Sequence, residues 1–81
     1  MISPNQLEAM IKAGLPDATV VAEDMKGTGD HYQVAVVSSA FEGLSLVKRH
    51  QLVYKAVNAA MSSDAIHALS LDTSTPDEVA S

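Results

Sequence analysis

Apolar and polar residues recur with two different periods along this chain, and the periods predict its helices and strands. Between residues 46 and 60, apolar side chains return every three or four positions, which is the spacing of one face of a helix. Ser45 can cap this helix, and Gly43 interrupts any earlier start. We therefore expect the helix to begin near Leu46. The residues expected on its apolar face are Leu46, Leu52, Val53, Ala56, Val57, Ala59 and Ala60.

A shorter helix is predicted over residues 4–13. Ser3 stands at the cap position, Pro4 at the first helical position and Gln6 three residues after the serine, which is the arrangement of a capping box. Gly14 is expected to stop the helix. Its apolar stripe consists of Leu7, Met10 and Ile11.

Residues 19–24, 31–38 and 65–72 have the alternation and β-branched content of strands. Residues 26–30, KGTGD, separate the first two strands as a hairpin loop with two glycines. The second strand becomes apolar on both faces towards its end, so we expect it to be central.

The order helix, strand, strand, helix, strand predicts an α+β domain with a three-stranded mixed sheet in the order 1-2-3. A hairpin makes the first two strands antiparallel, and a helical crossover makes the last two parallel. The helices are expected on one face of the sheet. The 81 residues suffice for a single domain over residues 1–81. Thr75-Pro76-Asp77-Glu78 repeats the cap, proline and acid signature of a helix start, but little room is left for a helix to gain stability. Residues 72–81 are therefore expected to form a short tail that can be flexible.

Composition narrows the classes of function. The chain has no cysteine, which excludes disulfides and thiolate sites made by this chain. Five basic residues against ten acidic ones give a net charge of −5, which opposes non-specific nucleic-acid binding. Residues 41–56 are locally basic, which suits either an acidic partner or an ordinary solvated helix face. Because no apolar run is long enough to span a membrane, we expect a soluble, cytoplasmic protein.

The predicted topology brings two of the three histidines to one end of the sheet. His31 begins the second strand and His67 lies near the start of its parallel neighbour, with the hairpin loop at the same end. Strand alternation favours opposite faces for the two rings. His50 begins the long helix at the other end, so it is not expected to share a metal site with His67. The residues alone equally allow His67 to be an ordinary strand histidine and His31 a surface residue.

Two stretches of this sequence resemble the BolA-like family. The pattern F-x-G-x-S-x-V-x-R-H runs from Phe41 to His50, and the stretch Ile66-His67-Ala68-Leu69 resembles the last strand of that family. The similarity extends from about residue 7 to residue 76. It implies a KH-like fold of the class II type, with a short helical turn before the long helix.

The resemblance further implies that His67 is a ligand to a [2Fe-2S] cluster shared with a CGFS-type monothiol glutaredoxin. The glutaredoxin and its glutathione supply the thiolates, so the chain alone is expected to hold no cofactor. An imidazole nitrogen is a suitable iron ligand in such a mixed site. Relatives often carry a Cys or a second His in the hairpin loop. Thr28 stands at the Cys position here, so the second ligand is either missing or replaced by His31.

The expected function is a non-enzymatic adaptor in iron–sulfur cluster trafficking, or in iron homeostasis and redox regulation. Its expected contacts with the glutaredoxin are Thr28, Gly29, Lys48, Arg49 and His50. For His50, a hydrogen bond to the turn at residues 41–43 is an equally simple alternative. Without its partner the chain is expected to be a monomer or a weak homodimer, with no membrane association.

A KH-like, nucleic-acid-binding transcription regulator is the alternative function. The G-x-x-G loop with which KH modules clamp RNA is absent, because Gly27-Thr28-Gly29 has the wrong spacing and lies in a hairpin. An enzyme is not expected. The chain offers no cysteine nucleophile, no Ser-His-Asp arrangement that the topology would assemble, and no paired carboxylates.

Overall fold

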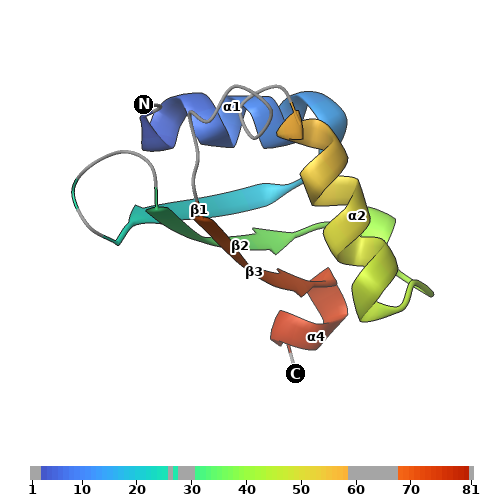
Figure 1. The fold of residues 1–81 in the computed structure, drawn as a ribbon. Coiled ribbons are helices and arrows are strands. Elements are labelled where there is room, and N and C mark those ends of the chain that lie inside the picture. Colours follow the sequence, from blue (N-terminus) through green and yellow to red (C-terminus); the bar gives the residue numbers. More distant parts are fainter. Residues whose placement is uncertain (1–2, 26, 28–30, 59–67, 81) are drawn as a thin grey trace.

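The computed structural model describes residues 3–25, 27, 31–58 and 68–80. The three strands form one mixed sheet in the order β1-β2-β3, and α1 and α2 cover one of its faces (Figure 1). This is the predicted α+β architecture. The elements are α1 (Pro4–Gly14), β1 (Thr19–Asp24), β2 (His31–Val37), the 3-10 helix η1 (Ser39–Phe41), α2 (Leu46–Ala56), β3 (Ala68–Ser74) and α4 (Pro76–Ala80).

The strand register sorts the side chains of the sheet onto two faces. β1 pairs antiparallel with β2, and β2 pairs parallel with β3, with His31 opposite Ala68 at one end and Val37 opposite Ser74 at the other. Every second residue of β2 is buried beneath the helices, and these residues are Tyr32, Val34 and Val36. β2 is therefore the central strand, as its two apolar faces predicted.

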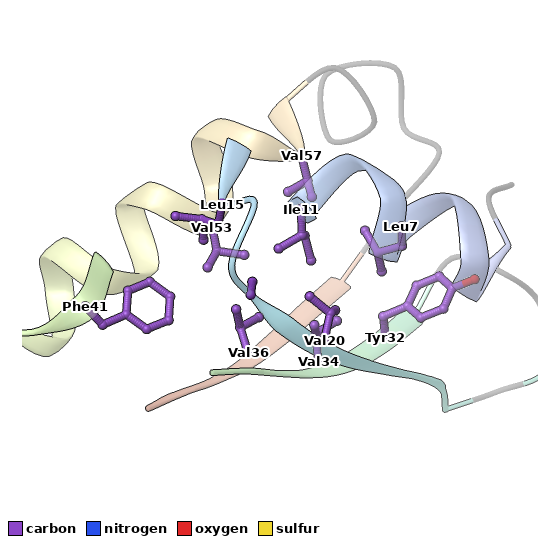
Figure 2. Packing of buried hydrophobic residues seen from close by; sticks show 11 residues of the cluster. Leu7, Ile11, Leu15, Val20, Tyr32, Val34, Val36, Phe41, Val53 and Val57 are labelled. Atoms are coloured by element: carbon purple, nitrogen blue, oxygen red, sulfur yellow. The ribbon is translucent and has the colours of Figure 1, made fainter. Parts of the chain in front are cut away.

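The core lies between this face of the sheet and the two helices (Figure 2). Leu7 and Ile11 of α1 and Val53 and Val57 of α2 are fully buried, and Phe41 enters the core from η1. Each such side chain contributes about 1.5–3 kcal/mol by leaving water. The core therefore holds α1, α2 and η1 on one sheet face.

The predicted helix starts are confirmed in detail. Ser3 and Gln6 form the capping box of α1, with Ser3 N donating to Gln6 Oε1 over 2.8 Å. Ser45 caps α2 by accepting from Lys48 N over 3.3 Å. Gly43 has a φ of +75°, a conformation that favours glycine and turns the chain towards α2. The short helical turn that the resemblance implied is η1.

Two expectations about α1 and α2 need correction. Leu46 was expected in the core but is 61% exposed. Helical spacing predicts on which side of the helix Leu46 lies. It does not predict whether another element packs against the first turn on that side. Gly14 does end α1, but Leu15 is the capping residue. A Cβ at Gly14 would lie 3.1 Å from Ala56 Cβ, so the glycine also permits close approach of α2.

The C-terminal region differs from its prediction. β3 extends two residues beyond the expected end, because Thr73 and Ser74 pair with the last residues of β2. The cap, proline and acid signature at residues 75–78 does start a short helix, because Pro76–Ala80 form α4. Part of the segment expected as a tail is therefore helical. No helix in the described part of the chain is long and apolar enough to cross a bilayer.

Candidate functional site

His31 marks one end of the sheet. It is the first residue of β2 and lies opposite Ala68, the first residue of β3. The two parallel strands thus begin at the same end, as predicted. The His31 side chain is partly exposed and alternates with buried Tyr32, which places it on the face away from the helices. Its carbonyl accepts from Met25 N over 2.9 Å, which closes the base of the β1–β2 hairpin.

The other residues predicted for this end are not described. His67 directly precedes Ala68 in the sequence but lies outside the described residues, as do Thr28 and Gly29. The ligand and contact roles of these three residues therefore stay predictions. Leu69, two positions after His67, is partly buried and packs against the core.

The described residues contain no group of three or more His, Cys, Asp or Glu that could hold a metal ion. A single imidazole such as His31 suits one position on an iron atom, because a neutral ring offers one nitrogen lone pair. The described residues therefore do not supply three ligands to a cluster bound through His31, which would need further ligands from elsewhere.

Arg49 ties the start of α2 to the C-terminal region. Its Nε donates to Leu44 O over 3.1 Å, and Nη1 and Nη2 donate to the two carboxylate oxygens of Glu78 over 2.7 and 3.3 Å. The Arg49 side chain is only 14% exposed. Hydrogen bonding from this guanidinium lowers the pKa of Glu78.

Glu78 also completes the cap of α4. Thr75 N donates to Glu78 Oε1 over 2.7 Å, and Glu78 N donates to Thr75 Oγ1 over 3.2 Å. This reciprocal pair is a capping box. A single carboxylate thus joins α4 to its own first turn and to Arg49. The short C-terminal helix is fixed by a charged pair, while Val79 is 59% exposed.

Among the described residues, His50 does not make the hydrogen bond to the turn at residues 41–43 that was the alternative role weighed equally for it. Its Nε2 atom is buried and has no hydrogen-bond partner among the described residues. Arg49 holds the entry of α2 instead, through Leu44 O. Arginine can do this because the several N–H donors of its guanidinium bind a carbonyl oxygen and a carboxylate at the same time.

Lys48, Arg49 and His50 do not form one surface. Lys48 is exposed, the Arg49 guanidinium is bound to Glu78, and His50 is partly buried. At 3.6 residues per turn, positions 48 and 50 lie on nearly opposite sides of α2. Their predicted role in partner binding stays a prediction, and Lys48 belongs to a different side of the helix from His50.

Sequence reasoning missed a polar cluster at the far end of the sheet from His31. Asp17 accepts from Ser38 Oγ over 2.7 Å, from Ser39 N over 2.9 Å and from Ser39 Oγ. These hydrogen bonds lower the Asp17 pKa from 3.8 to about 2, with the Ser39 hydroxyl as the largest cause. The sequence signal for this cluster was Asp17 in the turn before β1, together with Ser38 and Ser39 directly after β2, the antiparallel neighbour of β1. Their contact follows from the Thr19–Val37 register.

The comparisons with known proteins agree with this architecture. A family model described as BolA-like protein matches residues 10–78. The chain belongs to the BolA-like family. This confirms the resemblance carried by the Phe41–His50 pattern and places the whole described sheet within the matched region.

Two solved structures and one curated relative cover nearly all of this BolA-like chain. A bolA protein homologue from Coxiella burnetii is 41% identical, with full coverage of both chains and a TM-score of 0.84. BolA1 from Arabidopsis thaliana is 33% identical over 93% of each chain, with a TM-score of 0.81. An uncharacterised protein of Rickettsia prowazekii is 32% identical over 89% of this chain and 92% of its own length. The chain spans only 35% of the full chloroplastic BOLA1 of Arabidopsis thaliana.

Proposed function

We propose that this BolA-like chain is a non-enzymatic adaptor that binds a CGFS-type monothiol glutaredoxin and shares a [2Fe-2S] cluster with it. The role would be cluster trafficking, or iron and redox regulation, in the cytoplasm. The observation that carries the proposal is the β2–β3 register, which brings His31 beside the start of β3. The family-like stretch containing His67 leads directly into that strand.

In this proposal the cluster is cargo held between two proteins. His67 supplies one imidazole nitrogen, and the partner with its glutathione supplies the thiolates that this cysteine-free chain lacks. His31 is the candidate second ligand, because Thr28 in the loop is a poor donor for iron. The described end of the sheet offers one partly exposed imidazole.

The partner is proposed to dock at the hairpin loop, through Thr28 and Gly29, and to extend towards His50. The Nε2 atom of His50 is buried and has no partner among the described residues, so the glutaredoxin could bind it only after the side chain moves to the surface. Arg49 would act indirectly, because it positions α4 through Glu78.

Mixing the chain with a reconstituted, cluster-bearing glutaredoxin tests the proposal. We expect the visible circular dichroism spectrum to change and a one-to-one heterodimer to appear on gel filtration. His67→Ala should alter that spectrum, while Lys12→Ala on the exposed side of α1 should not. An unchanged spectrum with no heterodimer would refute the proposal.

We do not extend the proposal to nucleic-acid binding. The net charge is −5, and Arg49, one of the cations that would have faced phosphates, is bound to Glu78. The described structure adds no observation in favour of a transcription regulator.

A further inference from the structure

A second surface lies beside α2, at the end of the molecule away from His31. Two adjacent hollows of about 490 and about 310 Å³ share Leu52 and Lys55 in their walls. We call the two hollows together the α1–α2 groove. Its apolar wall includes Met10, Leu15, Leu52 and Ala56, and Lys48 and Lys55 stand along α2.

The position of the groove follows from the fold. Leu15 precedes β1, whose first residue pairs with Val37, the last residue of β2. β2 has seven residues, which corresponds to a length of about 20 Å, and His31 is at its other end. A partner in the α1–α2 groove would therefore leave the His31 end of the sheet accessible.

Small side chains open the groove where the two helices meet. Gly14 at the end of α1 lets the helix backbone come so close to α2 that an added Cβ would lie 3.1 Å from Ala56 Cβ. Glycine and alanine at this contact bring the helix axes together without filling the space beside them. The hollow lined by Ala13, Gly14 and Ala56 is the result.

The charge of the groove contrasts with the charge of the chain. The net charge of the chain is −5. Lys48 and Lys55, in contrast, are exposed cations that make no ion pair within the described part of the structure. α2 contains no acidic residue that could pair with them. Lys48 is in the first turn, where the helix dipole disfavours a cation. Intrinsic helix stability therefore does not account for a lysine at position 48.

We propose that the α1–α2 groove binds an acidic amphipathic helix of a partner protein. Lys48 and Lys55 are seven residues apart, which is two helical turns or about 10 Å. A partner helix with carboxylates two turns apart, and leucine-like side chains between them, would pair with both lysines and fill the apolar wall. Insertion of an amphipathic helix into a groove is a common recognition mode.

A second copy of this chain fits the groove poorly. Its acidic helix α4 has five residues, and its two carboxylates, Asp77 and Glu78, are adjacent rather than two turns apart. Glu78 is also engaged by Arg49. Phosphates of a nucleic acid would leave the apolar wall of Leu15 and Leu52 without a matching surface.

A designed peptide provides the test. The probe is a fluorescein-labelled helix of about five turns, with Glu residues two turns apart and Leu residues between them. Its control has the same composition with the Glu residues moved to the face opposite the leucines. Binding to the full chain is measured by fluorescence anisotropy. Lys48→Glu and Lys55→Glu, singly and together, are compared with Lys12→Glu. Lys12 is the matched control, because it is an exposed lysine in the last turn of α1, as Lys55 is in α2.

We expect the probe to bind more tightly than the control peptide. Each groove variant should weaken binding roughly threefold and the double variant roughly tenfold, as for solvent-accessible charge pairs. Lys12→Glu should leave the affinity unchanged, and far-ultraviolet circular dichroism should show that all variants are folded. Equal binding of both peptides, equal loss with Lys12→Glu, or no binding would overturn the proposal. So would displacement of the peptide by a second copy of the chain or by duplex DNA.

This test is independent of the glutaredoxin experiment. Lys55→Glu should still form the glutaredoxin heterodimer, because Lys55 is not one of the expected contacts with the glutaredoxin and the His31 end of the sheet is unchanged. Weaker peptide binding with an intact cluster spectrum would separate the two surfaces.

Discussion

The two ends of the sheet differ in how many side-chain contacts join their segments. At the end where β2 finishes, Asp17 joins the turn before β1 to Ser38 and Ser39, and Arg49 joins α2 to Glu78. At the end where β2 begins, His31 lies next to the start of β3 and closes a hairpin. One end links four segments through side chains, and the other presents a partly exposed imidazole.

This contrast separates the residues that hold the fold from the residues proposed to bind. A helix and a 3-10 turn enter the core at the cross-linked end, where Phe41 is fully buried. Substitutions there should change the free energy of unfolding. Substitutions at the His31 end should change the cluster spectrum while the fold persists.

The largest effect is expected for Phe41→Ala. This side chain is fully buried, so its truncation leaves a cavity as well as losing transfer energy, at a cost of about 3–5 kcal/mol. Small domains have about 5–15 kcal/mol in total, so urea denaturation should show a large shift of the midpoint. Val79→Ala, at a 59% exposed position, is the control and should stay within about 0.5 kcal/mol of the wild type.

Asp17→Asn should cause the second-largest loss of stability. The substitution removes the charge that accepts three hydrogen bonds from Ser38 and Ser39. Because the folded pKa of Asp17 is lowered to about 2 from 3.8, its contribution is complete above about pH 4 and is lost as the pH falls towards 2. Thermal melts over this window should show a smaller decline for Asp17→Asn than for the wild type. An identical decline in both proteins would show that Asp17 does not hold this end.

Glu78→Gln should have a smaller and more local effect. It removes the charge opposite Arg49 but keeps an oxygen that can accept from Thr75 N. The folded pKa of Glu78 is lowered, so its stabilisation is present above its unfolded pKa of about 4.3 and is lost as the pH falls below that. Amide hydrogen exchange should become faster in α4, with α1 unchanged. Equal exchange in α4 of both proteins would contradict the tie between α4 and Arg49.

His31→Ala should have the smallest effect on stability. Its side chain is partly exposed on the sheet face away from α1 and α2, so the free energy of unfolding should change by no more than about 0.5 kcal/mol. If His31 is the second ligand, the visible spectrum of the glutaredoxin complex should change. A large loss of stability would contradict the difference between the two ends, because His31 would then be one of the residues that stabilise the fold.

Local sequence signals predicted much of the fold. The capping residues Ser3 and Ser45 and the alternation of Tyr32, Val34 and Val36 each act through neighbours a few positions away. For this reason the helix starts, the bounds of β1 and the central place of β2 agree with the structure. Gly43 likewise has the positive φ that its place before the helix suggested.

Features that depend on distant partners were predicted less well. Arg49 is joined to α4 through Glu78, 29 positions later in the sequence, and no local pattern predicts that contact. Asp17 acts on serines 21 and 22 positions away, which only the strand register reveals. The α1–α2 groove depends on how closely Gly14 approaches Ala56. Each is a tertiary contact that composition and periodicity do not encode.

Pulsed electron paramagnetic resonance on the reduced glutaredoxin complex tests the central claim most directly. The chain would be labelled with ¹⁵N-histidine while the glutaredoxin and glutathione stay unlabelled. We predict a ¹⁵N coupling between the cluster and an imidazole of this chain, and loss of the His67 contribution to that coupling with His67→Ala. A complex whose cluster shows no coupling to the labelled histidines would contradict the proposal that this chain shares the cluster.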